Sequence, residues 1–299
     1  MVSLIVETWR YFQSHDGRLL SGAIAFYASL ALAPLGVLMV LIASFVLPVD
    51  AAQRELVGQL EMFVGPDLAK FLAQAISDMS SQTESLAAPI LGGLFMIYMS
   101  ARLFTMLRRA LNHMWSIRPK LLVHARDDWF QILQRRLLAF AMVLVFGASL
   151  VVLVILHAIA SGAARFLGGD SYLLTLGQFG SALAVLTVLI SLVYRWLPDA
   201  IIAWRDVLVG AAVTSLFIVG GSLLIGLYLG HTGPASWYGA AGSLIVLLLW
   251  IFYTTQIFLM GAVFTRAWAR RRGRAIEPLP YAVPVETPSY RAHARGGEA

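Results

Sequence analysis

Six long apolar stretches divide this chain and leave little room for a water-soluble fold. They cover residues 23–47, 87–107, 137–159, 176–194, 207–229 and 241–265. A helix needs about 20 apolar residues to cross the hydrocarbon core of a bilayer, and each stretch meets or nearly meets that length. Hydrophobic residues are 59% of the chain and charged residues only 13%. The sequence therefore predicts an all-α, polytopic membrane protein with six transmembrane helices.

Basic residues lie almost entirely on alternate connections between these stretches. Of the 22 Lys and Arg residues, 18 fall on the N-terminal segment, the second and fourth loops and the C-terminal tail. Basic residues are retained on the cytoplasmic side, so this distribution predicts that both termini face the cytoplasm. The net charge of +6 is thus concentrated on one face. It predicts attraction of anionic lipid headgroups to that face, and no binding of nucleic acid.

The chain is predicted to form one membrane domain between two shorter segments. Residues 1–21 are polar with interspersed aromatics, which predicts a cytoplasmic segment at the inner interface. Residues 22–268 form the transmembrane domain, and its first apolar stretch is too long for a cleavable signal, so we expect an uncleaved anchor. Residues 269–299 are basic, rich in proline and without apolar periodicity. They are predicted to be a disordered cytoplasmic tail.

The outer loop 48–86 carries two amphipathic patterns. Residues 51–64 place apolar side chains on one face of a helix, and a second helix is predicted to start at Pro66 and to run to about Met79. Two such helices cap the bundle from outside or form a lid over a cavity, and the pattern leaves both interpretations open.

Two residues inside the first two stretches depart from a plain apolar helix. Pro34 predicts a kink, which either lines a cavity or shapes helix packing. Arg102 is a cation within the second stretch, about 9 Å along the helix from Arg108. Its side chain either reaches the inner headgroups or an ion pair, or it faces a substrate.

The later stretches carry further polar groups. Tyr253 and Gln256 lie near the middle of the sixth stretch and indicate either interhelical hydrogen bonds or a polar pathway. The fifth stretch is rich in glycine, which favours close helix packing in lipid. In the fourth loop, Asp199 lies near Arg195 and Asp206 follows Arg205, which predicts ion pairs local to that loop.

Several kinds of chemistry have no sequence signature here. The chain has no Cys, and no two of its six His residues lie four positions apart, so no metal-site pattern is present. Neither a phosphate-binding GxxxxGK[ST] loop nor a GxSxG elbow occurs. No Asp or Glu falls inside the six stretches, which disfavours ion-coupled transport through a buried carboxylate. We therefore expect no cofactor, no metal and no enzymatic activity.

A set of motifs resembles the YihY/BrkB family of bacterial inner-membrane proteins, once labelled ribonuclease BN-like. The matching segments are 23–35 (AIAFYASLALAPL), 111–115 (LNHMW), 194–198 (YRWLP), 204–206 (WRD), 238–243 (YGAAGS) and 249–250 (LW). The resemblance covers about residues 10–268. It implies a multi-pass protein of the bacterial cytoplasmic membrane, associated with envelope integrity and proposed to transport lipid. The family has Gly-Ala-Glu late in the sixth helix, whereas this chain has Val263 at the position of the Glu.

These observations favour a non-enzymatic envelope-integrity protein that moves or exports a lipid or amphiphile without ATP. A structural scaffold or assembly partner is the alternative, with the outer helices and the basic tail as docking surfaces. A membrane-bound hydrolase or nuclease is a third hypothesis, and it requires convergent titratable groups that the sequence does not show. The candidate pathway residues are Pro34, Tyr98, Arg102, Tyr194, Arg195, Tyr253 and Gln256.

Overall fold

The structure is a computed structural model. It describes residues 2–46, 48–64, 70, 73–74, 87–119, 141–142, 144–146, 148–149, 151–152, 155–156, 159, 171–232, 240–274 and 276–285. Its long helices are α1 (Val2–Ser14), α2 (Gly17–Ala43), α3 (Val49–Val64), α5 (Ala87–Met114), α7 (Ser171–Trp196), α8 (Trp204–Thr232) and α10 (Ala240–Arg271). Its strands are β1 (Ile117–Pro119), β2 (Ala200–Ile201), β3 (Glu277–Pro278) and β4 (Ala282–Pro284).

Within the described residues, three helices are long and apolar enough to cross a membrane, and α2 makes a fourth if its two halves count as one span. The three segments are Phe179–Trp196, Trp204–Ser222 and Ile245–Arg271, in α7, α8 and α10. They coincide with the last three predicted stretches. α5 coincides with the second stretch, and much of stretch 137–159 lies outside the described residues. The helical, multi-pass architecture is confirmed, and the number of six spans stays a prediction.

α2 is bent near its middle. Its halves, Gly17–Leu32 and Leu35–Ala43, meet at an angle of 52°. The break contains Pro34, and a proline inside a helix lacks the backbone N–H that the helix needs. The kink predicted at this proline is confirmed.

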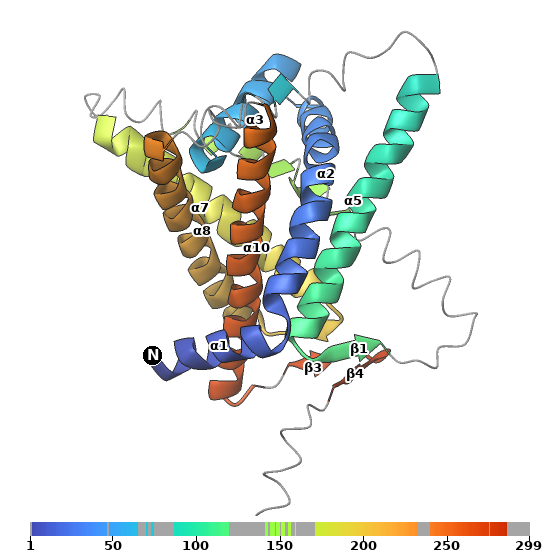
Figure 1. Ribbon diagram of the computed structural model, residues 1–299, viewed down its shortest axis with the longest axis vertical. Helices are drawn as coiled ribbons and strands as arrows, with labels where there is room; N and C mark the ends of the chain where they lie inside the picture. Colours follow the sequence, from blue (N-terminus) through green and yellow to red (C-terminus); the bar gives the residue numbers. More distant parts are fainter. Residues whose placement is uncertain are drawn as a thin grey trace, which may run out of the picture.

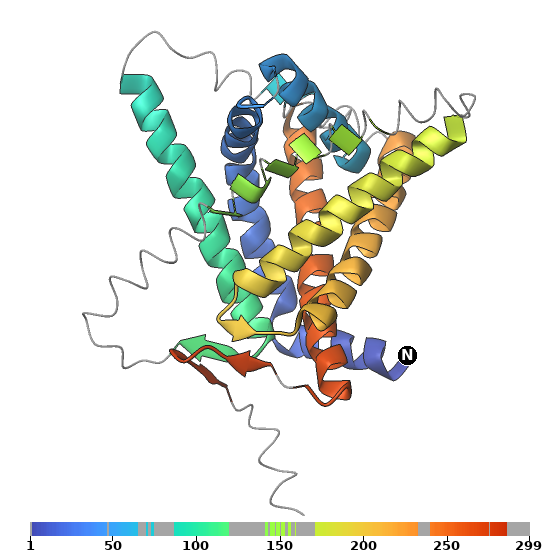
Figure 2. The same cartoon turned by 180° about the vertical axis from the view of Figure 1, so that it is seen from behind.

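The helices converge at one end of the molecule and spread apart at the other (Figure 1). α2 packs against α5 and α10, and α8 packs against α10 and α7. α5 leans to one side and α7 and α8 lean to the other, which Figure 2 shows from behind. We call the converged end, which carries α1 and the strands, the inner end. The opposite end, near α3, is the outer end.

The N-terminal interfacial segment and the first amphipathic segment of the outer loop form helices at opposite ends. α1 lies across the inner end, where it packs against α10 and buries Leu4 and Phe12 (Figure 1). α3 lies at the outer end, packs against α2 and α8, and confirms the helix predicted over 51–64. The second outer helix, predicted from Pro66, lies largely outside the described residues.

α8 and α10 approach closely through two glycine–threonine contacts. Thr214 of α8 lies against Gly261 of α10, and Thr265 of α10 lies against Gly210 of α8, so that a Cβ at either glycine would overlap the facing hydroxyl. The Thr214 hydroxyl donates to the Gly210 carbonyl at 2.7 Å, and the Thr265 hydroxyl donates to the Gly261 carbonyl at 2.8 Å. Both hydroxyls are satisfied within their own helices, which suits an apolar surrounding. We call these four residues the α8–α10 seam.

In the part of the chain that the structure describes, four short strands close the inner end in two antiparallel pairs. β1 pairs with β4 through Ile117↔Pro284, Arg118↔Val283 and Pro119↔Ala282, and β2 pairs with β3 through Ala200↔Pro278 and Ile201↔Glu277. The tail over 269–299, predicted to be disordered, is therefore ordered over 269–274 and 276–285. α10 itself continues to Arg271, and Ala282 is buried in the core of the bundle. Packing against loops far away in the sequence stabilises this part of the tail, although its own sequence shows neither helical nor strand periodicity. Residues 286–299 lie outside the described residues.

Candidate functional site

Arg102 and Tyr98 of α5 form an exposed pair within the second predicted span. The Arg102 Nε donates to the Tyr98 hydroxyl at 3.0 Å, and the guanidinium lies 5.2 Å from the centre of the Tyr98 ring. Tyr98 is one helical turn closer to the outer end, because α5 runs from the outer end to β1. The Arg102 side chain thus points away from the inner end, in the direction that helical side chains lean. Among the described residues, no carboxylate forms an ion pair with it.

Tyr194 of α7 is fully buried. Its hydroxyl donates to the Phe258 carbonyl of α10 at 2.6 Å and lies 3.2 Å from the Thr214 hydroxyl of α8. Its ring packs edge-on against Trp115, with centroids 6.2 Å apart. Tyr194 therefore joins three helices at the centre of the bundle.

Arg195 braces the connection between α7 and α8. Its guanidinium donates to the Ile202 carbonyl and lies 6.0 Å from the centre of the Trp204 ring. These contacts hold the loop that carries β2, close to the inner end.

Tyr253 and Gln256 lie half-buried on α10. The Tyr253 hydroxyl packs where a Cβ on Gly221 of α8 would stand, so this tyrosine fills a notch in the neighbouring helix. Two of the seven predicted pathway residues, Arg102 and Tyr98, contact each other. The others are distributed over α2, α7 and α10.

A buried polar cluster at the inner end joins α5 to the connection between α7 and α8. The Asp199 side chain is 2% exposed and forms an ion pair with Arg108, whose Nε donates to Oδ2 at 3.2 Å. Asn112 donates from Nδ2 to Asp199 Oδ2 at 2.7 Å and accepts from the Asp199 backbone N–H at 2.8 Å. Arg108 and Asn112 are one turn apart on α5, so both reach the same carboxylate. We call these three residues the inner latch.

The ion pairs predicted to stay within the fourth loop are wrong. Asp199 pairs with Arg108, which is 91 positions away, and Asp206 pairs with Arg274 of the tail at 3.3 Å. Asp206 lies in the first turn of α8, where the helix dipole favours a negative charge. Its two oxygens have no hydrogen-bond partner among the described residues, so Arg274 contributes charge and not a directed hydrogen bond. The four-residue spacing of Arg108 and Asn112 was the one available sequence signal for the latch.

The tail ties these inner-end elements together. The Leu279 N–H donates to the Asp199 carbonyl at 3.0 Å, and the Val285 N–H donates to the Ser116 carbonyl at 2.6 Å. With the two strand pairs and the Arg274–Asp206 ion pair, residues 274–285 connect the ends of α5, α7 and α8. We call residues 274–285 the strap.

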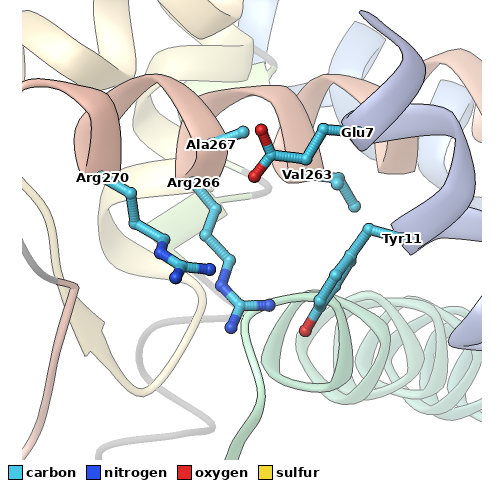
Figure 3. Close-up of a pocket in the computed structure, with 6 residues that line it drawn as sticks. All are labelled: Glu7, Tyr11, Val263, Arg266, Ala267 and Arg270. Atoms are coloured by element: carbon cyan, nitrogen blue, oxygen red, sulfur yellow. The ribbon is translucent and has the colours of Figure 1, made fainter. Parts of the chain in front are cut away.

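A small cleft lies beside the strap, between α1 and α10 (Figure 3). It is lined by Glu7, Tyr11, Val263, Arg266, Ala267 and Arg270, and its volume is about 20 Å³. The Arg266 guanidinium lies 4.4 Å from the centre of the Tyr11 ring, and the Tyr11 hydroxyl lies 2.5 Å from the Ser116 hydroxyl. Val263, where the resembling family has Glu, faces this cleft, and the cleft receives a carboxylate from Glu7 of α1 instead.

The spanning helices, closed at the inner end by polar contacts, define a multi-pass helical membrane protein. The chain belongs to the family described as virulence factor BrkB, whose model matches residues 8–285. This finding confirms the resemblance carried by the sequence motifs.

The relatives include membrane proteins and a protein with a ribonuclease-like name. A UPF0761 membrane protein of Chromobacterium violaceum is 26% identical over 291 residues, covering 93% of this chain and 66% of the relative. UPF0761 membrane protein NMC0462 of Neisseria meningitidis is 26% identical over 260 residues, 85% of this chain and 60% of the relative. The ribonuclease-like protein YfkH of Bacillus subtilis is 22% identical over 284 residues, 94% of this chain and 100% of the relative. This chain therefore spans less than two thirds of the length of the two UPF0761 relatives. No solved structure matches.

Proposed function

We propose that this protein moves or exports an anionic lipid or amphiphile across the bacterial cytoplasmic membrane, without ATP, and thereby supports envelope integrity. Both termini and the inner end then face the cytoplasm, as the distribution of basic residues predicts. The proposal includes no catalytic group and no cofactor.

The observation that carries the proposal is the orientation of Arg102. A cation in the hydrocarbon region is costly, and such cations mark substrate pathways when they do not reach the interface. The Arg102 guanidinium is exposed and turned toward the outer end, and its described polar contact is the neutral hydroxyl of Tyr98. An anionic headgroup that passes along α5 would supply the missing counter-charge.

The uneven shape of the bundle supports the same proposal. The inner ends are held together by the latch and the strap, whereas the outer ends of α5 and of α7 and α8 diverge (Figure 1). Alternating access would require these inner contacts to open for a substrate to enter from the cytoplasm.

The alternative of a membrane scaffold relies on the basic tail as a docking surface. Up to Val285 this tail is engaged within the chain itself, through the strap. That engagement leaves less of the tail for a partner and favours the transport proposal.

The test measures lipid binding and movement in variants of Arg102. Arg102→Gln removes the charge, Arg102→Lys keeps it, and Arg109→Gln makes the same change at an exposed position seven residues further along α5. Native mass spectrometry would compare retained phosphatidylglycerol, and proteoliposomes would report movement of a labelled anionic lipid between leaflets. We expect Arg102→Gln alone to lose retention and movement. Equal behaviour of Arg102→Gln and Arg109→Gln would contradict the proposal.

A further inference from the structure

The cleft between α1 and α10 holds positive charge that its own carboxylate does not neutralise. Arg266 and Arg270 lie one turn apart on α10, and Figure 3 shows both side chains extending toward the same space. The cleft's carboxylate, Glu7, forms its ion pair with Arg271 at 3.2 Å. Among the described residues, neither Arg266 nor Arg270 has an ion-pair partner.

Arg266 is also poorly satisfied by hydrogen bonds. Its Nη1 lies 3.4 Å from both the Met114 carbonyl and the Ser116 hydroxyl, beyond the usual range for an N–H···O bond. The side chain is half-buried, and a cation that is partly removed from water favours an ionic partner. The volume of about 20 Å³ admits a group of about the size of a water molecule, such as one oxygen of an anion that stays at the mouth, and excludes an acyl chain.

The arrangement of Arg266 selects among anions. A planar guanidinium stacked on an aromatic ring keeps its N–H donors in a fixed fork, which matches the oxygens of a phosphate group. We propose that this cleft is a phosphate-binding site, in which Arg266 and Arg270 hold a phosphate group at the cytoplasmic face. This site is separate from Arg102, and the inference does not depend on transport.

The position of α1 favours a lipid as the source of that phosphate. α1 exposes Ile5, Val6 and Trp9, and Arg18 lies 5.7 Å from the centre of the Trp9 ring. An amphipathic helix with apolar and aromatic residues on one edge and polar residues on the other lies at the boundary of headgroups and acyl chains. The cleft on its α10 side is then close to the phosphates of the inner leaflet.

The test compares ligands that differ only in the phosphate. Full-length protein in a mild nonionic detergent would be titrated with phosphatidic acid and with diacylglycerol of the same acyl chains, and bound lipid counted by native mass spectrometry. Arg270 is exposed, so Arg270→Gln is not expected to disturb folding, and Arg270→Lys keeps the charge without the fork. Arg272→Gln is the matched control, since Arg272 leaves the same helix end but lies over Trp268, 4.6 Å from its ring centre.

We expect preferential binding of phosphatidic acid by the wild type and an affinity about tenfold lower in Arg270→Gln, the effect of losing one charge-assisted hydrogen bond. Arg272→Gln should bind like the wild type, and Arg266→Gln should lose more than Arg270→Gln. Inorganic phosphate provides the second arm: if it displaces phosphatidic acid and its own binding depends on Arg270, the natural source is soluble, and otherwise it is a lipid. Equal losses in Arg270→Gln and Arg272→Gln, or equal binding of both lipids by the wild type, would overturn the proposal.

Discussion

The inner end and the α8–α10 seam are held together by opposite means. At the inner end, a buried ion pair, side-chain amides and strand pairs join segments far apart in the sequence. In the seam, each threonine hydroxyl donates to its own helix, and the α8 and α10 backbones approach through glycines, with the Tyr194 hydroxyl of α7 beside Thr214. The difference follows from the residues present: at the inner end a charged carboxylate requires specific partners, whereas small residues in the seam let helices approach closely in an apolar medium.

The contrast suggests that the two regions have different sensitivities. Each seam threonine lies against a glycine of the facing helix, so we expect the seam to stay fixed. The inner latch is made of groups that water can also satisfy once they separate. Together with the strap it is the region that can open.

Removing the latch carboxylate should have the largest effect. Asp199→Ala leaves the Arg108 guanidinium and the Asn112 amide buried without their shared partner, and breaking a buried ion pair costs about 3–5 kcal/mol. We expect the free energy of unfolding to fall by that amount, measured by denaturant titration in detergent. Glu7→Ala is the control, because the Glu7–Arg271 pair is 47% and 41% exposed and is expected to contribute less than about 1 kcal/mol. Similar losses in both variants would show that Asp199 does not hold the inner end.

A single methyl group in the seam should have the next largest effect. In Gly261→Ala the new Cβ overlaps the Thr214 hydroxyl, and overpacking of this kind costs about 1–3 kcal/mol. Gly220→Ala on α8 is the matched control, since a Cβ there meets nothing within 4 Å. We expect Gly220→Ala to be neutral or slightly stabilising, and the same unfolding assay would compare them. A Cβ at Gly261 would also stand 2.7 Å from the Tyr194 hydroxyl. If Gly261→Ala is as stable as Gly220→Ala, the steric reason is wrong.

Deleting residues 276–299 removes the strand-forming part of the strap, and it should loosen the inner end and leave the seam unchanged. A chain that ends after Ala275 keeps the Arg274–Asp206 ion pair but loses β3 and β4. Amide hydrogen exchange should rise in the loops that contain β1 and β2 and stay constant in the middle of α8 and α10.

A matched stabilising variant is available because the chain has no Cys. Arg118→Cys with Val283→Cys places two cysteines at directly paired, exposed positions. If amide hydrogen exchange changed equally over the whole bundle, the inner end and the seam would not be independent.

The smallest expected effect is a pH dependence confined to the inner end. The rings of His15 and His113 lie 5.8 Å apart, and burial lowers the pKa of both; Asp16 opposes this shift, and Arg118 adds to it at His113. The unfolded chain therefore binds protons at a higher pH than the folded chain. Stability should fall as pH drops through the ordinary histidine pKa of about 6.5, and the loss is complete below the lowered folded values. His113→Gln should flatten the curve of unfolding midpoint against pH, and an unchanged slope would contradict the assignment.

Several features could be predicted because they depend on neighbouring residues. The length and apolarity of the stretches predict the helices of α7, α8 and α10, and the proline at position 34 predicts the bend of α2. Helical periodicity over 51–64 predicts α3, and the glycines of the fifth stretch predict a close approach of α8 to another helix. Each of these follows from local backbone geometry or from the cost of polar groups in lipid.

The sequence by itself thus determined that this is a helical membrane protein, where its helices bend and which of them pack closely. Only the tertiary structure decided that Asp199 meets Arg108, that the tail returns as a strap, and that Tyr11 stacks on Arg266. These contacts join residues about 70 to 255 positions apart, and their partners are chosen by how the inner ends of the helices come together. No local pattern encodes that choice, because a buried charge takes whichever partner the packed helices bring within reach.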